Sequence, residues 1–188
     1  ANMASRMLKK TGLILITLII TVLALVGIVP SCSFFSPSDS TPQSEKAPDF
    51  TLPTLTGANI TLSELKGTPV VLNFWTTNCH NCWSELLYFE DIFQQSEGKI
   101  EVIAINVGES VSTVQNFFTY KPTMTVALDE KRKTFVNYCR NYNDPQEAVP
   151  FTIFVDSEGV VKYAKLGRFE NEAELLDTLH SVFNPILT

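Results

Sequence analysis

The chain has 188 residues, of which 45% are hydrophobic and 18% are charged, so its composition is that of a globular protein rather than a disordered or fibrous one. The length fits one domain with an N-terminal extension, because a single core commonly takes about 100–200 residues. The formal net charge of −6 disfavours nucleic acid as a partner, since nucleic-acid affinity depends on Lys and Arg that neutralise phosphates.

An uncharged apolar segment over residues 12–29 follows Lys9 and Lys10 and ends at Pro30. Its length is about the minimum for crossing the hydrocarbon core of a bilayer. The two lysines before the segment, with none directly after it, place the N-terminus in the cytoplasm and the rest of the chain on the far side. We therefore expect the protein at the cell membrane, anchored by its N-terminus, with the folded domain on the extracytoplasmic side.

Residues 1–32 fit more than one kind of targeting segment. An uncleaved signal anchor would remain as a membrane helix. Alternatively, residues 29–32 (Val-Pro-Ser-Cys) resemble a bacterial lipoprotein cleavage box, which would make Cys32 the lipidated residue, although Pro is uncommon at that place. Simple secretion is a third interpretation. Residues 33–46 are rich in Ser and Pro and predict a flexible linker, so we place the folded domain at residues 47–188.

The first half of this domain shows alternating strand and helix patterns. The expected elements are, in order, a hairpin around Thr56–Gly57, one capped helical turn over Ser63–Gly67, a strand over Val70–Trp75 that is buried on both faces, and a helix from His80 to about Ser96. The apolar residues of that helix recur at helical spacing: Trp83, Leu86, Leu87, Phe89, Ile92 and Phe93.

The second half continues the alternation and ends with a hairpin and a helix. We expect a strand over Ile100–Val107, a helix capped by Ser110, a strand over Met124–Leu128, a helix from Lys131 to about Tyr142, a hairpin of Phe151–Val155 with Val160–Leu166, and a closing helix over Glu172–Phe183. Such an order predicts an α/β fold in which a central mixed β-sheet is flanked by helices on both faces.

Two cysteines, Cys79 and Cys82, lie where the apolar strand ends and the first long helix begins. The unpaired N–H groups and the dipole of a helix N-terminus favour negative charge, so the first cysteine is expected to be a thiolate and the attacking nucleophile. Cys82 lies one turn further in and would resolve the mixed disulfide. The alternatives are a zinc site and a static structural disulfide. A zinc site is disfavoured, because zinc needs about four ligands and the other His and Cys residues are scattered.

Several segments, in this order along the chain, resemble the TlpA/ResA group of thioredoxin-like proteins. They are residues 47–52 (APDFTL), 62–67 (LSELKG), 71–82 (VLNFWTTNCHNC), 105–110 (INVGES) and 149–156 (VPFTIFVD). The resemblance implies a thioredoxin-like fold with an N-terminal β-hairpin extension. It also implies extracytoplasmic dithiol–disulfide exchange, commonly the reduction of apocytochrome c before haem attachment.

Glu85 is the candidate proton-handling residue. It lies three positions after Cys82 and therefore on the same helical face, where a partly buried carboxylate could accept and return the proton of the resolving thiol. The resembling family carries a functional Glu at the matching place; the alternative is a solvated helix residue. Thioredoxin itself has a buried Asp at the position of Asn73, and Asn cannot act as a base.

Val149 and Pro150 are candidate substrate-binding residues. By resemblance, the peptide bond between them matches a cis bond that faces the cysteine pair in this family, although few X-Pro bonds in folded proteins are cis. A cis bond would free the Val149 backbone to pair with an extended substrate segment and would leave Pro150 beside the disulfide. The alternative is a trans proline that opens a strand.

Four other residues complete the candidate site and its surroundings. Trp75 is expected to pack in the core beneath the active-site turn, and Trp83 to line a substrate groove. His80 near Cys79 would favour the thiolate and make the couple more oxidising, unless it faces solvent instead. Cys139 falls on the apolar side of its helix and is interpreted as a buried, inert thiol.

The favoured hypothesis is an enzyme that reduces disulfides in extracytoplasmic proteins, with apocytochrome c as the favoured partner. It would take electrons from a membrane thiol donor, because the compartment is oxidising. No cofactor is expected beyond the redox-active Cys79–Cys82 pair.

Two alternatives belong to other classes. A thiol peroxidase is suggested by Thr76, which stands where peroxiredoxins carry a Thr before the Cys, but Leu72 occupies the place of their Pro. A non-enzymatic metal-binding module on the same fold would be expected to have a wider cysteine spacing and a distant His.

Overall fold

A computed structural model describes residues 45–183; the predicted membrane segment and Cys32 lie outside them. The centre of the domain is a five-stranded sheet in the order β5-β4-β3-β6-β7. Its strands are β3 (Val70–Trp75), β4 (Glu101–Val107), β5 (Thr125–Asp129), β6 (Phe151–Val155) and β7 (Val161–Leu166). Strands β3, β4 and β5 run parallel, while β6 and β7 are antiparallel to their neighbours, so the predicted mixed sheet is confirmed.

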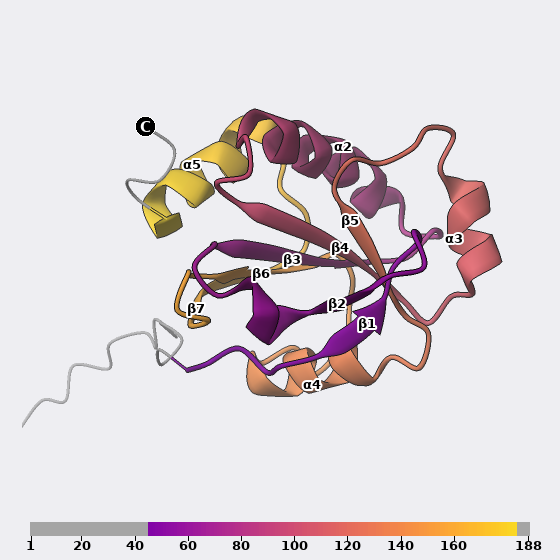
Figure 1. Cartoon of the computed structure of the whole chain (residues 1–188), viewed down its shortest axis with the longest axis horizontal. Helices are drawn as coiled ribbons and strands as arrows, with labels where there is room; N and C mark the ends of the chain where they lie inside the picture. The colour runs from indigo at the N-terminus through magenta and orange to yellow at the C-terminus, as the bar shows by residue number, and fades with distance from the viewer. Residues whose placement is uncertain (1–44, 184–188) are drawn as a thin grey trace, which may run out of the picture. The chain divides into compact units, whose positions relative to one another are not determined.

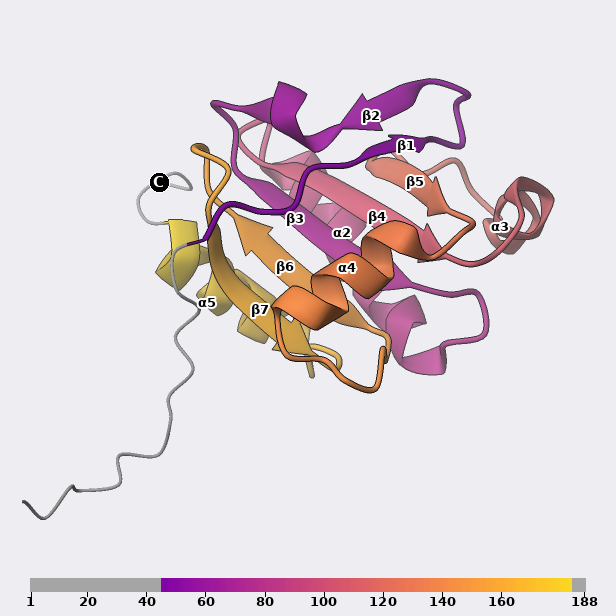
Figure 2. The ribbon, with the colours of Figure 1, turned by 90° about the horizontal axis from the view of Figure 1, so that it is seen from below.

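Helices cover both faces of the sheet, as Figures 1 and 2 show. Helices α2 (His80–Gln95) and α5 (Glu172–Phe183) lie on one face, and α4 (Lys133–Asn141) lies on the other. Helix α3 (Val111–Phe117) connects β4 to β5 and begins at Ser110, whose hydroxyl accepts the N–H of Thr113 at 3.2 Å, as predicted for its cap. The predicted alternation of strands and helices is therefore confirmed.

The central strand β3 is buried along its whole length, because both faces of the sheet carry a hydrophobic layer. Side chains alternate along a strand, so Val71 and Trp75 enter the layer under α2 and α5. Leu72 and Phe74 point the other way and pack with residues of α4 and of the N-terminal hairpin. This double burial fixes the register of β3 and hence the position of the turn that follows it.

The predicted N-terminal hairpin is present as β1 (Thr51–Pro53) and β2 (Asn59–Thr61), with Gly57 at a φ of +86° that the turn requires. It is followed by a short 3₁₀ helix, η1 (Leu62–Leu65). The capped turn expected over Ser63–Gly67 corresponds to this helix, and the Asp49 carboxylate accepts the Ser63 N–H at 2.9 Å at its start. After β1, Thr54 forms a bridge with Ala127 of β5.

Helix α2 departs from the sequence pattern in one respect. Leu86, Phe89 and Ile92 are buried, but Trp83 and Leu87 remain 41% and 54% exposed. The apolar stripe of the helix is thus wider than the core that covers it. Within residues 45–183, no helix has the length and apolarity needed to cross a bilayer.

Candidate active site

Cys79 and Cys82 form a disulfide at the N-terminus of α2, with an S–S distance of 2.02 Å. Cys79 is the N-cap residue, and its Sγ accepts the backbone N–H of Cys82 at 3.2 Å. Cys79 is half-buried, whereas Cys82 is fully buried. An incoming sulfur can therefore approach Cys79 but not Cys82, and a charge on Cys79 would face the amide end of the helix.

The turn before the disulfide is held by Glu109, which the sequence did not single out. One carboxylate oxygen accepts the Thr77 N–H at 2.8 Å and the other accepts the Thr77 hydroxyl at 2.6 Å. The first oxygen also accepts the side-chain amide of Asn106 at 2.6 Å. Glu109 therefore ties the end of β4 to the active-site turn. The available signal was its place in residues 105–110, one of the family-like segments.

Glu85 is fully buried on α2, three residues after Cys82. One of its carboxylate oxygens accepts the backbone N–H of Phe169 at 2.7 Å, while the other finds no hydrogen-bond partner within the described residues. Burial raises the pKa of Glu85 to about 7, against the lowering effects of the Phe169 N–H and of the Lys165 and Arg168 charges. The alternative of a solvated helix residue is wrong.

Asn73 lies in the middle of β3 and is fully buried. Its side-chain amide donates to the hydroxyl of Thr152 on β6 at 3.0 Å. This hydrogen bond joins β3 to β6. Because the Asn73 amide is neutral and cannot act as a base, Glu85 is the buried carboxylate nearest in sequence to the cysteine pair.

The Val149–Pro150 peptide bond is cis, as the resemblance implied. Strand β6 starts one residue later, with Phe151 opposite Phe74 of β3. Val149–Pro150 therefore lies at the end of the sheet where β3 leads into the active-site turn. Pro150 is buried, and half-buried Val149 packs against the hydrophobic layers of both faces.

The loop before Pro150 is organised by Asp144, another residue that the sequence did not identify. Asp144 is buried and accepts the N–H groups of Gln146 at 3.2 Å and Ala148 at 2.9 Å. It also accepts the thiol of Cys139 at 3.4 Å. Cys139 is buried as predicted, and burial, together with Asp144, raises the pKa of its thiol to about 12.

The aromatic residues near the disulfide divide into a buried and an exposed set. Trp75 is fully buried, as expected, and its ring centroid lies 5.0 Å from that of Phe117. Trp83 is exposed, and its indole N–H donates to the Thr77 carbonyl at 3.0 Å. His80 is exposed and stacks on Trp83, with 4.2 Å between the ring centroids. In the part of the chain that the structure describes, no group of three His, Cys, Asp or Glu side chains is arranged to hold a metal ion.

A mixed sheet with a Cys-x-x-Cys disulfide at the start of its first long helix defines a thioredoxin-like thiol–disulfide exchange protein. A sequence profile of the AhpC/TSA family matches residues 44–164, and the chain belongs to this family. Within the thioredoxin superfamily it is a ResA-like protein, and its activity is that of a thiol–disulfide oxidoreductase.

The relatives support this placement. The thiol–disulfide oxidoreductase ResA of Bacillus subtilis is 35% identical over 159 residues, which cover 83% of this chain and 82% of that protein. The thioredoxin-like protein YneN of the same organism is 33% identical and covers 66% of this chain and 72% of its own length. A crystal structure from Chlorobium tepidum, described as a thiol:disulfide interchange protein DsbE, has 26% identity and a TM-score of 0.65, covering 78% of this chain and 98% of that one.

Proposed function

We propose that this chain is a membrane-tethered, extracytoplasmic reductase of disulfides in partner proteins, with apocytochrome c as the favoured partner. The observation that carries the proposal is the disulfide at the N-terminus of α2, with Cys79 accessible and Cys82 buried. The sequence identity to ResA of Bacillus subtilis supports the chemistry, and the apolar segment over residues 12–29 supports the tether.

The reaction begins with the protein in its dithiol form. The Cys79 thiolate attacks one sulfur of a partner disulfide, forming a mixed disulfide and releasing the partner's second sulfur as a thiolate. The N–H of Cys82 and the helix dipole stabilise the Cys79 thiolate before the attack, as they face its Sγ in the oxidised form. Cys79 is thus the nucleophile.

The second step is intramolecular. Cys82 loses its proton and attacks the Cys79 sulfur, so the Cys79–Cys82 disulfide forms and the partner leaves as a dithiol with two more electrons. Glu85 is the base for this proton, because it is buried three residues away on the same helix and has a pKa of about 7. A membrane thiol donor must then return two electrons to the pair.

The partner is expected to meet four residues around Cys79. Val149 and Pro150 lie at the same end of the sheet and would pair with an extended segment of the partner. Trp83 and His80 form an exposed aromatic stack beside the disulfide. Trp75 and Asn73 are buried beneath this surface and have supporting roles.

The test is to trap the partners. A Cys82→Ser variant of the full chain, expressed in cells that assemble c-type cytochromes, should accumulate Cys79 mixed disulfides that a thiol reductant releases. Recovery of apocytochrome c supports the proposed partner. If proteins are trapped but apocytochrome c is not among them, the reductase activity stands and the proposed partner is rejected. If no protein is trapped, both the reductase activity and the partner are rejected. Turnover of peroxide that a Cys79→Ser control lacks would assign a peroxidase instead.

The tether is tested separately by mass spectrometry of membrane-extracted protein. An intact N-terminus without lipid on Cys32 supports the anchor, whereas a chain that begins at diacylated Cys32 supports the lipoprotein. A protein found only in the soluble extracytoplasmic fraction would reject the tether.

A further inference from the structure

A groove lies beside the disulfide, between the first turns of α2 and the segment that leaves α3. Its volume is about 310 Å³, and the side chains of Trp83, Leu86 and Leu87 form one wall. Phe117, Phe118 and Tyr120 form the opposite wall. Among the described residues that line it, none is charged. The groove therefore offers no partner to a phosphate, a carboxylate or an ammonium group, and it suits apolar surface.

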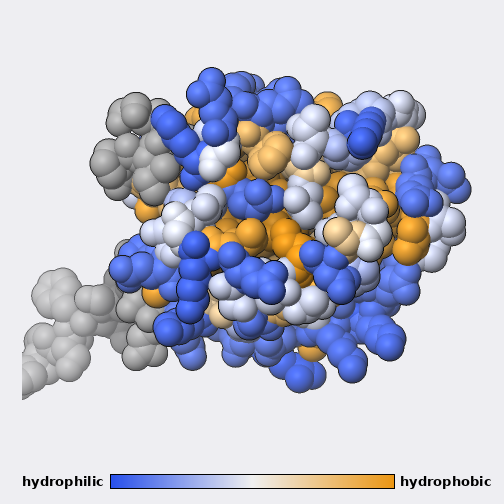
Figure 3. Space-filling model, in the orientation of Figure 1, coloured by the Kyte–Doolittle hydropathy of each residue, from blue (hydrophilic) through white to orange (hydrophobic). Residues whose placement is uncertain are grey.

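The walls of this groove contain several large apolar side chains that are exposed to solvent. Six large hydrophobic side chains are exposed in the described part of the chain, and Trp83, Leu87 and Tyr120 are three of them, at 41%, 54% and 41%. Figure 3 shows apolar surface between polar side chains towards α3, separate from the apolar band over the strands in the middle of this face. Exposed apolar surface that is gathered in this way marks an interaction site more often than a single exposed side chain does.

The aromatic side chains of the groove contact one another, and one of them contacts a fully buried ring. Trp83 is fixed by its hydrogen bond to the Thr77 carbonyl at 3.0 Å and by His80, which stacks on it. The Phe117 ring lies 6.1 Å from Trp83 and 5.0 Å from the fully buried Trp75. A cavity whose walls are already ordered loses little conformational entropy when it is filled.

The distance from the reactive sulfur limits what can occupy the groove. Trp83 and Leu87 follow Cys79 by four and eight residues on one helix, which places them about 6 and 12 Å further along the helix axis. An extended polypeptide advances about 3.3 Å per residue. A partner whose cysteine meets Cys79 can therefore lay the side chain found about two to four residues from that cysteine into the groove.

We propose that the groove formed by Trp83, Leu86, Leu87, Phe117, Phe118 and Tyr120 is a specificity site that binds a large apolar side chain of the partner polypeptide, two to four residues from the attacked cysteine. This inference rests on the proposed function, because only a polypeptide that exchanges with Cys79 is held in this register. The groove is continuous with the surface that the exchange reaction must use, since Trp83 follows Cys82 directly and is bonded to the active-site turn. It selects partners by sequence, whereas the cysteine pair alone would accept any accessible disulfide.

The experiment uses the reduced full chain and short peptides whose single cysteine is held in a disulfide with a small chromogenic thiol. One peptide carries Phe three residues from the cysteine, and its partner peptide carries Ser at that place. The small symmetrical disulfide of the same chromogenic thiol serves as a reference that has no side chain for the groove. The rate constants for reduction should be about tenfold higher for the Phe peptide than for the Ser peptide. Moving Phe to the eighth residue should remove the advantage.

Variants distinguish the groove from the rest of the surface. Leu87→Ser and Tyr120→Ser should reduce the Phe preference towards one, while the rate with the small disulfide stays the same. Tyr163→Ser is the matched control, because Tyr163 on β7 is 37% exposed, close to the value for Tyr120, but lies outside the groove. It should retain the preference.

Each contrary outcome has a distinct meaning. Equal rates for the Phe and Ser peptides would overturn the proposal that the groove is a specificity site, and so would a preference that survives both groove substitutions. Either result would leave the oxidoreductase activity unaffected. Failure to reduce even the small disulfide would overturn the proposed function itself. Self-association that Leu87→Ser abolishes would assign the groove to a second copy of the chain, and binding to phosphatidylcholine vesicles that Leu87→Ser abolishes would assign it to lipid; both would overturn the proposal.

Discussion

The two ends of the central sheet use polar groups in opposite ways. At the disulfide end, where β3 and β4 lead into the turns that carry Cys79 and Glu109, buried polar atoms are left without full hydrogen bonding. At the opposite end, where β3 starts and the turn between β6 and β7 lies, polar groups are exposed or paired. The two ends share the same strands, so the difference comes from the segments attached to them.

Most of the buried polar atoms without a hydrogen-bond partner lie towards the disulfide end of the sheet. Among the described residues, four buried side-chain atoms find no hydrogen-bond partner: the carbonyl oxygens of Asn73 and Asn106, the indole nitrogen of Trp75 and one carboxylate oxygen of Glu85. Asn106 lies directly opposite Trp75 in the sheet, so two of the four atoms belong to neighbouring residues. Leaving a buried polar atom unpaired costs about 1–3 kcal/mol.

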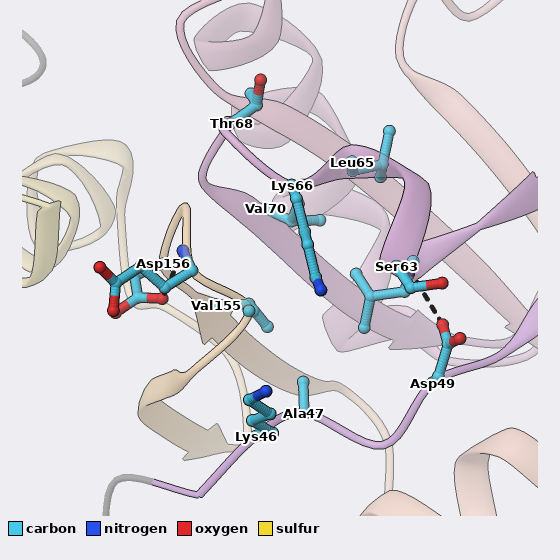
Figure 4. Close-up of a pocket in the computed structure, with 13 residues that line it drawn as sticks. Lys46, Ala47, Asp49, Ser63, Leu65, Lys66, Thr68, Val70, Val155 and Asp156 are labelled. Atoms are coloured by element: carbon cyan, nitrogen blue, oxygen red, sulfur yellow. Dashed lines mark hydrogen bonds between the residues drawn. The ribbon is translucent and has the colours of Figure 1, made fainter.

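The opposite end of the sheet also has a hollow, shown in Figure 4, but its carboxylates Asp49 and Asp156 have hydrogen-bond partners. Asp49 accepts the N–H groups of Ser63 and Phe50, each at 2.9 Å. Although partial burial disfavours the charge of Asp49, the hydrogen bonds from Ser63 and Phe50 hold its pKa below the ordinary value. Asp156 similarly accepts the N–H groups of Glu158 and Val160. Asp49 therefore joins the segment before β1 to η1, and Asp156 closes the turn between β6 and β7.

A cavity alone does not mark the reactive region of this protein. Two carboxylates that line the hollow in Figure 4, Asp49 and Asp156, accept backbone N–H groups, whereas the disulfide end combines a buried carboxylate of raised pKa with an accessible sulfur. Substitutions at the disulfide end should therefore change both stability and exchange, and substitutions at the opposite end should change stability only.

The largest expected effect comes from Trp75→Ala. Removing a fully buried tryptophan should lower the free energy of unfolding by about 3–5 kcal/mol, as measured by urea denaturation of the oxidised protein. The exchange rate of the folded variant should also fall, because Trp75 supports Phe117 and the active-site turn. Leu62→Ala at the opposite end is the control: it should cost about 2–5 kcal/mol but leave the exchange rate of the folded protein unchanged. Loss of exchange in both variants would show that the two ends of the sheet do not differ in their role in exchange.

Glu85→Gln should remove a pH dependence of stability. The pKa of Glu85 is about 7 in the folded state, above the ordinary value of 4.5. Between these values the folded state binds more protons than the unfolded state, so this group makes the protein lose stability as the pH rises from about 4.5 to 7. The wild-type protein should therefore lose about 3 kcal/mol relative to Glu85→Gln between about pH 4 and pH 8. Denaturation at several pH values measures this, and parallel curves for the two proteins would show that the carboxylate does not titrate there.

The same substitution separates the catalytic role of Glu85 from its effect on stability. Exchange by folded Glu85→Gln should be slower and should lose the pH-dependent phase that the wild-type protein shows near the pKa of this group. An unchanged rate–pH profile would remove Glu85 from the reaction while leaving its burial in place.

Glu109→Gln should have a smaller effect on stability, about 1–3 kcal/mol, because the amide cannot accept all three hydrogen bonds that the carboxylate accepts from Thr77 and Asn106. Exchange should slow as the active-site turn loosens. Asp49→Asn is the matched control, since that carboxylate also accepts backbone N–H groups but lies at the opposite end. If both variants slow exchange equally, the two ends are not functionally distinct.

The smallest effect is expected from Lys165→Met. Lys165 pairs with Glu174 at 2.9 Å and its ammonium lies 4.9 Å from the Phe169 ring, whose backbone N–H bonds to Glu85. Its charge lowers the pKa of Glu85, so its removal should raise that pKa, and the stability loss described for Glu85 should move to higher pH. The more exposed Lys162, 4.0 Å from Asp156, provides the control Lys162→Met. A shift to lower pH would contradict this account.

Much of the fold was predictable because it depends on local patterns. The apolar run over Val70–Trp75 specifies a strand buried on both faces, and Ser110 specifies the start of α3 through a hydrogen bond only three residues away. The cysteine pair was predictable for the same reason: it stands at the junction of two strong patterns. The cis bond before Pro150 came from the resemblance to a family rather than from the residues themselves.

The missed features depend on contacts between distant segments. Glu109 accepts hydrogen bonds from Thr77, 32 residues away, and no local sequence pattern predicts such a pairing. Asp144 lies in a polar loop that sequence reasoning treats as solvated, although its side chain is buried. Helical spacing also groups Leu87 with the core residues of α2, but spacing cannot tell how much of the apolar face of a helix the neighbouring elements cover.

The bridge between Thr54 and Ala127 has a practical consequence for work on this domain. Together with the hydrogen bond from the Leu55 N–H to the Val126 carbonyl, this bridge covers the outer edge of β5. Without it, β5 would expose unpaired backbone groups at the edge of the sheet. Bare strand margins recruit other chains and promote aggregation. A truncated expression fragment that starts at Val70 should therefore precipitate, and one that retains everything from Glu45 onward should stay monodisperse.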